Sequence, residues 1–150
     1  MSWGNTDAYS ENGISGPHKW AEVLLTPTDS VMELIPIHRN PVSVKPNQRL
    51  WKAEFPASRG PHLAHFLNQC QRIGEDGRPI VVRDSSWGDG LQVEGKFNYF
   101  IPRVCNIWSA QAIESLGGKV SPLQATTARS LAKQLVKKEN GFVLVHDGLE

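Results

Sequence analysis

Short segments in which side chains alternate between two faces recur along this chain, and they come in runs that few helical patterns interrupt. Three of them precede the first helical pattern, at 19–26, 31–37 and 49–55. Alternation with a period of two predicts strands with at least one buried face. Runs of strands broken by few helices are typical of α+β domains. We therefore expect an α+β fold, with a mostly antiparallel sheet of five to six strands and two to three helices packed on it.

Turn residues and apolar content refine the strand assignment. Segments 19–26 and 31–37 are predicted to form a hairpin, because Pro-Thr-Asp-Ser between them is typical of turns. Segment 142–146 is apolar almost throughout, which predicts a central strand buried on both faces. Further strands are predicted at 42–44, 80–83, 91–95 and 96–104.

Three segments have the periodicity of helices. Segment 58–74 has an apolar stripe at helical spacing that includes Cys70, which we interpret as a buried side chain. Segment 106–118 ends at paired glycines. The last helix is predicted to begin at Ser121, where Ser-Pro-x-Gln matches a capping box, and to end at Gly141.

The length of 150 residues suits one domain with a single core. Residues 1–17 are polar and contain three glycines and a proline, so they are predicted to be a flexible leader. Residues 18–150 are then the single α+β domain. No apolar run is long enough to span a membrane and no signal peptide is recognisable, so a cytoplasmic protein without membrane contact is expected.

Charge and cysteine content exclude several classes of protein. Sixteen Lys and Arg residues face fifteen Asp and Glu residues, a net charge of +1, which argues against a wholly basic nucleic-acid-binding surface. Local basic patches remain compatible with this balance. Two cysteines without a Cys-x-x-Cys pattern do not indicate a disulfide scaffold, a zinc site or a redox site.

Residues 83–90 are the most unusual stretch, with Arg83, Asp84, Trp87 and Asp89 among serines and glycines. The glycine spacing does not fit a dinucleotide-binding loop or a P-loop, and the acidic positions do not fit a calcium loop. Two interpretations remain for this hairpin tip. It is either a structural turn with Trp87 folded onto the sheet, or a contact surface in which Trp87 and Arg83 anchor a partner.

His62 and His65 lie one turn apart, outside the apolar stripe of the first predicted helix. A metal site would need a third ligand, and neither Asp nor Glu lies between or beside them in the helix, so exposed histidines without a bound metal are expected. An alternative is an acid–base pair of His62 or His65 with Asp84 or Asp89, which would make the protein a small hydrolase.

Basic residues line one face of the last predicted helix, at Arg129, Lys133 and Lys137. Lys96 and Tyr99 lie in the segment with alternating aromatic residues, where sheet aromatics beside a lysine can stack on unpaired bases. A lysine-lined helix face is more often simply solvated, and aromatic residues on a strand are more often core.

The absence of catalytic signatures favours a small non-catalytic binding or accessory module that needs no cofactor. Its partner is expected to be a protein or a nucleic acid, bound by the 83–90 tip and the basic face of the last helix. The predicted binding residues are Arg83, Trp87, Lys96, Tyr99, Arg129, Lys133 and Lys137. The alternatives are the hydrolase described above and a structural subunit of a larger assembly, which would expose large apolar patches.

Overall fold

The computed structural model describes residues 1–10, 13–38, 40–44, 48–85 and 89–148. A four-stranded antiparallel sheet has the order β1-β2-β5-β4. Its strands are β1 (Ser2–Asn5), β2 (Ser30–Leu34), β5 (Leu91–Glu94) and β4 (Val81–Asp84). A second antiparallel sheet pairs β3 (Leu50–Lys52) with β6 (Val143–His146). The predicted α+β class with antiparallel strands is confirmed, although the six strands of the described residues form two sheets.

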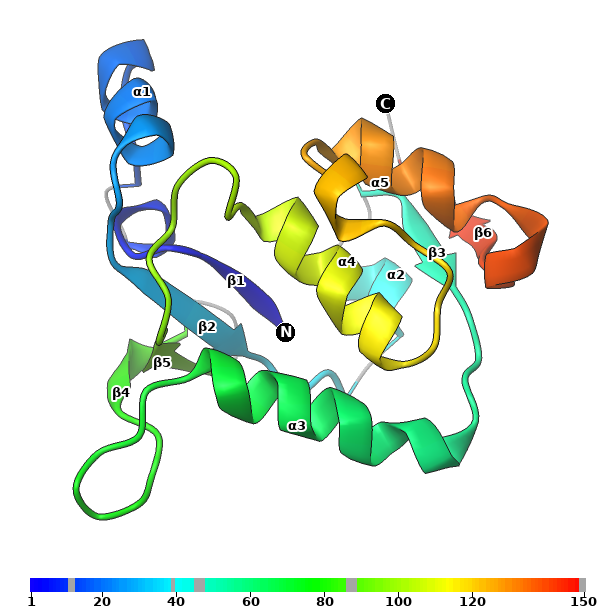
Figure 1. The fold of residues 1–150 in the computed structure, drawn as a ribbon, viewed down its shortest axis with the longest axis horizontal. Helices are drawn as coiled ribbons and strands as arrows, with labels where there is room; N and C mark the ends of the chain where they lie inside the picture. Colours follow the sequence, from blue (N-terminus) through cyan, green and yellow to red (C-terminus); the bar gives the residue numbers. More distant parts are fainter. Residues whose placement is uncertain (11–12, 39, 45–47, 86–88, 149–150) are drawn as a thin grey trace.

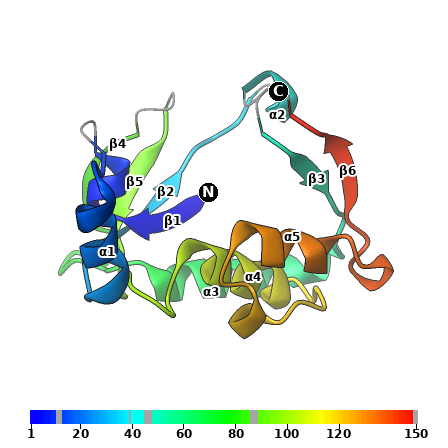
Figure 2. The same cartoon turned by 90° about the horizontal axis from the view of Figure 1, so that it is seen from above.

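Five α-helices occur in the described part of the chain: α1 (Pro17–Leu25), α2 (Pro41–Val44), α3 (Gly60–Cys70), α4 (Cys105–Ser115) and α5 (Ala128–Leu135). Helix α4 contacts α3, α5 and β1. The two sheets lie at opposite ends of the layer formed by α3, α4 and α5 (Figures 1 and 2). Helix α4 is therefore the central element of the fold. None of the helices in the described ranges combines the length and apolar character that crossing a membrane requires.

The main hydrophobic core lies between the four-stranded sheet and helices α3 and α4. Trp3 is 1% exposed there and packs against Tyr99 and Trp108, with ring centroids 5.4 and 6.5 Å away. A second core lies between α4 and α5. The buried side chains of the main core are Trp3, Val23, Met32, Cys70, Val93, Tyr99, Val104, Ile107 and Trp108, and those of the second core are Ala110, Val120, Ala125, Leu131 and Leu135.

The prediction of a flexible leader over residues 1–17 is wrong for its first residues. Strand β1 forms an edge of the larger sheet, with Trp3 opposite Met32 of β2. The 3-10 helix that follows, Asp7–Tyr9, places the ring of Tyr9 against Gly4, where a Cβ atom would lie 2.7 Å from that ring. A side chain at position 4 would therefore displace the Tyr9 ring. A single tryptophan in a polar segment gives no periodicity, so the strand pattern could not be recognised.

The predicted strand at 19–26 is wrong, because this segment is helix α1. Pro17 lies in the first helical turn, where its fixed φ angle and missing N–H are compatible with a helix. Trp20, Val23 and Leu24 have helical spacing as well as alternating positions, and a short apolar run does not distinguish the two. The predicted hairpin with 31–37 is therefore absent, and β2 pairs with β1 and β5 instead.

Other predicted elements are partly confirmed. Helix α3 lies within 58–74, helix α4 begins one residue before the predicted segment 106–118, and Cys70 is buried. Strands β4 and β5 pair as the predicted hairpin. Segment 96–104 is a loop that makes isolated bridges, and not a strand. Segment 42–44 belongs to helix α2.

The last helix and strand also differ from the prediction. Helix α5 begins after Thr127, which forms a reciprocal capping box with Ser130, whereas Ser121 precedes a 3-10 helix (Pro122–Gln124). Helix α5 ends at Leu135, and Gly141 instead ends a following 3-10 turn in a left-handed conformation. The central position predicted for 142–146 is wrong, since the side chains of Val143–Val145 in β6 are about half exposed.

Candidate functional site

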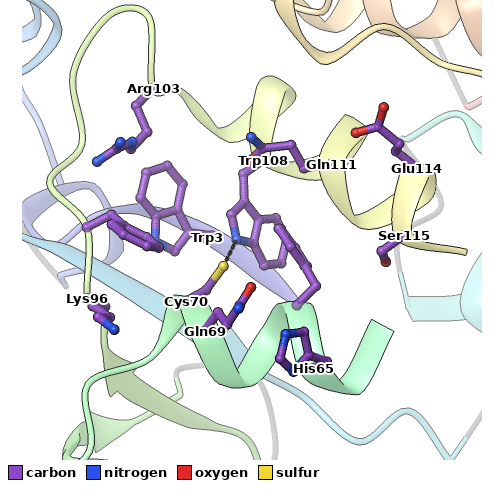
Figure 3. Close-up of a pocket in the computed structure, with 12 residues that line it drawn as sticks. Trp3, His65, Gln69, Cys70, Lys96, Arg103, Trp108, Gln111, Glu114 and Ser115 are labelled. Atoms are coloured by element: carbon purple, nitrogen blue, oxygen red, sulfur yellow. Dashed lines mark hydrogen bonds between the residues drawn. The ribbon is translucent and has the colours of Figure 1, made fainter. Parts of the chain in front are cut away.

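A cleft of about 650 Å³ lies between helices α3 and α4 and the loop that joins β5 to α4 (Figure 3). This volume is in the range of small-molecule sites. Helix α3 and helix α4 form two walls, residues 96–103 form a third, and Trp3 of β1 lies at the floor. The lining residues are Trp3, His65, Phe66, Gln69, Cys70, Lys96, Phe97, Arg103, Trp108, Gln111, Glu114 and Ser115.

The floor of the cleft is aromatic and tightly packed. Trp108 stacks on Trp3 with an interplanar angle of 17°, and Phe66 packs against Trp108 at 5.6 Å between ring centroids. Phe66 and Cys70 are one turn apart on α3, so they face α4 together. The indole Nε1 of Trp108 donates a hydrogen bond to Cys70 Sγ at 3.2 Å. These contacts hold Trp3, Cys70 and Trp108 in a buried apolar layer, against which Phe66 is tilted at 45°.

The groups at the floor are neutral. Burial raises the pKa of the Cys70 thiol, although the Trp108 hydrogen bond opposes this shift, so the sulfur stays protonated near neutral pH. Beneath the floor, burial is the largest cause that raises the pKa of Tyr99 to about 12, and the nearby Cys105 thiol adds to it. The Nε1 atom of Trp3 is buried and has no hydrogen-bond partner among the described residues. The charged side chains that can contact a ligand therefore lie at the rim of the cleft.

Two cations lie at one end of the rim. Lys96 follows β5, and its backbone N–H donates to Cys70 O at 2.8 Å, which fixes the loop beside α3. The Arg103 guanidinium lies over the Phe97 ring, 4.8 Å from the centroid. Both cationic side chains are exposed, and neither forms an ion pair with any residue that the structure describes. They are available to an anion.

The opposite end of the rim carries an acid and neutral polar groups. Figure 3 shows Glu114 and Ser115 of α4 and His65 of α3 on the far side of the cleft from Lys96 and Arg103. Glu114 forms no ion pair within the described ranges. The cleft is therefore polarised, with positive charge at one end, negative charge at the other and an apolar floor between them.

The predicted site residues fall in several places. Lys96 and His65 line the cleft. Tyr99 is buried in the core under Trp3, so its ring is not an open stacking surface. Trp87, the predicted anchor of the hairpin tip, lies outside the described residues.

The rest of the hairpin tip lies away from the cleft lining. Arg83 on β4 is half-buried, whereas Asp84 and Asp89 are exposed, and none of the three lines the cleft. The hydrolase interpretation requires Asp84 or Asp89 beside a histidine. The structure brings His65 into a cleft whose carboxylate is that of Glu114 instead.

His62 is exposed on α3 and does not line the cleft. In the described part of the chain, no three or more His, Cys, Asp and Glu side chains are grouped as metal ligands. The basic residues Arg129, Lys133 and Lys137 are exposed on or just after α5, and none of them lines the cleft. The cationic side chains of the cleft and those on or just after α5 thus form two separate groups on the protein surface.

Apart from Lys96 and His65, the residues that line the cleft were not predicted as site residues, and Trp3, Arg103 and Glu114 are among those missed. Trp3 lies in the segment assigned to a leader, Arg103 in a segment assigned to a strand, and Glu114 in a helix with no distinctive motif. The sequence does show that Trp108, Gln111 and Ser115 share one face of α4, since they recur at helical spacing. That pattern shows which residues share a face, but not which face borders a cleft.

Comparison of the chain with protein-family models, with curated proteins and with solved structures gave no match. The function is therefore inferred from the residues of the cleft.

Proposed function

We propose that this protein is a non-catalytic binding module whose cleft takes a small anionic ligand with a flat apolar part. The single observation that carries this proposal is the position of Lys96 and Arg103. Both line a cleft with an aromatic floor, and neither has an ion-pair partner within the described residues. A concave apolar surface with a few convergent polar groups is the usual form of a small-molecule site.

The floor and the rim have different roles in this proposal. A flat ring that covers the half-buried Phe66 and the exposed Phe97 removes apolar surface from water, which provides the non-directional part of the affinity. The anionic group of the ligand then lies between Lys96 and Arg103, which fixes its orientation. Because both cations are exposed, each is expected to contribute about 0.2–1 kcal/mol, and salt should weaken the binding.

The probe for this proposal is 2-naphthoate, with 2-naphthamide as its uncharged counterpart. Binding is followed by ¹H–¹⁵N NMR of the full chain, through the backbone signals of the cleft residues and the indole signals of the tryptophans. We expect 2-naphthoate to shift signals of Lys96, Gln69 and Gln111, and to bind more tightly than 2-naphthamide.

Substitutions at the rim separate the cleft from the basic face of α5. Lys96→Gln and Arg103→Gln should each weaken 2-naphthoate binding about 1.4- to 5-fold, the range expected for one exposed charge. Lys133→Gln removes the same charge from α5 and should leave the affinity unchanged. Equal binding of acid and amide, or a loss caused by Lys133→Gln alone, would contradict the proposal.

Exposed cations on and just after α5 support nucleic acid as a second candidate partner. Arg129, Lys133 and Lys137 recur at intervals of four residues and form no ion pair with described residues. If they contact phosphates, single-stranded DNA should bind with an affinity that falls steeply with salt, and Lys133→Gln should reduce that salt dependence. Binding that does not change with salt would rule out this candidate.

A further inference from the structure

The two charged ends of the cleft do not neutralise each other. Lys96 and Arg103 lie at one end and Glu114 at the other, on opposite sides of the aromatic floor (Figure 3). Neither cation forms an ion pair with Glu114. Three charged side chains of one cleft are thus left without a charged partner in the described part of the protein, and they are arranged with opposite signs at the two ends.

Polar side chains line the cleft between its two charged ends, and they support a ligand that reaches from one end to the other. Gln69 of α3 and Gln111 of α4 are exposed at the cleft, and amide side chains both donate and accept hydrogen bonds. Ser115 adds a hydroxyl beside Glu114, although this hydroxyl donates to the backbone oxygen of Ala112 at 2.7 Å. Among the described residues that line the cleft, Glu114 is the only one with a carboxylate.

We infer that the ligand of this cleft is a zwitterion with a flat apolar middle, whose anionic group lies at Lys96 and Arg103 and whose ammonium group lies at Glu114. This inference rests on the proposed function, because it takes the anion site at Lys96 and Arg103 as given. A ligand with a negative charge alone leaves Glu114 without a counter-charge, and a cationic end complements it. Charge complementarity of this kind contributes selectivity more than affinity.

The test uses 6-(ω-aminoalkyl)-2-naphthoates with one to four methylene groups between ring and nitrogen, so that the series covers different spans of the cleft. Each compound is compared with its N-acetyl counterpart, which keeps the carboxylate and the ring but has no positive charge. We expect at least one amine to bind about 1.4- to 5-fold more tightly than its acetylated form, the effect of one exposed ion pair. High salt should reduce this advantage.

Glu114→Gln should abolish the advantage of the amine, so that each amine and its acetylated counterpart bind this variant with the same affinity. Glu75→Gln is the matched control, since it removes an exposed carboxylate that does not line the cleft, and it should keep the advantage. An advantage that is missing at every chain length, or that persists in Glu114→Gln, would overturn the inference. If 2-naphthoate does not bind in the cleft, the proposed function itself is wrong. If 2-naphthoate binds but the amines have no advantage over their acetylated forms, only the inference of a zwitterionic ligand is wrong.

Discussion

Replacing Trp3 with alanine tests whether the N-terminal strand is part of the core that forms the floor of the cleft. The side chain is 1% exposed and packs on Tyr99 and Trp108. A tryptophan buries about 150–250 Å². At about 25 cal/mol per Å², the loss of that surface corresponds to about 4–6 kcal/mol. Alanine retains a small part of this buried surface. Replacing a buried aromatic side chain with alanine costs about 3–5 kcal/mol, so we expect Trp3→Ala to lower the free energy of unfolding by an amount in that range.

The assay is urea unfolding followed by circular dichroism, with Trp3→Phe and Trp20→Ala as comparisons. Because Nε1 of Trp3 has no hydrogen-bond partner, phenylalanine loses only ring volume, and the expected cost is about 1–2 kcal/mol. Trp20 is 43% exposed on α1, so its replacement by alanine should cost clearly less than that of Trp3. A free energy of unfolding for Trp3→Ala within about 0.5 kcal/mol of wild type would refute the placement of β1 in the core.

Two further perturbations test the packing around α4. Asn140 donates from Nδ2 to the backbone oxygens of Lys119 and Gln134, at 3.1 and 2.8 Å, and accepts from the Lys119 backbone N–H at 2.6 Å. Asn140→Ala should cost about 2–4 kcal/mol in urea unfolding because buried backbone groups lose partners, and an unchanged midpoint would contradict this role. The pKa of Tyr99 is raised from 10.0 to about 12, and burial also raises the pKa of Tyr9. At pH 10 the tyrosinate absorbance at 295 nm should therefore be lower in the folded protein than in the unfolded chain. Above pH 10 the folded protein holds a proton on Tyr99 that the unfolded chain has lost, so the stability from Tyr99 is complete below pH 10 and falls between about pH 10 and 12. Equal tyrosinate absorbance of the folded and the unfolded protein at pH 10 would contradict this.

Strong local patterns were enough to predict part of the fold. The apolar stripe of α3 and the short β-branched segment of β4 each specify one type of element. Helix α1 was missed because the spacing of Trp20, Val23 and Leu24 fits both a helix and a strand. Strand β6 is apolar at successive positions, which predicts burial, but few residues from the rest of the chain cover it.

The cleft could not be predicted because its residues are far apart in the sequence. Trp3 and Trp108 stack across more than one hundred residues, and only the pairing of β1 with β2 brings Trp3 to that position. Arg103 and Glu114 reach opposite ends of one cleft because α4 runs along its wall. Local periodicity carries no information on such contacts. Lys96 was nevertheless predicted as a binding residue, and the structure places it at the cleft.

A crystal structure of the protein with 2-naphthoate is the most direct test of the cleft as a binding site. The ring should lie over the aromatic floor beside Trp108, with a carboxylate oxygen about 2.7–3.2 Å from Lys96 Nζ or a guanidinium nitrogen of Arg103. A complex with the naphthoate bound outside the cleft, or with its carboxylate directed toward Glu114, would contradict the proposed function.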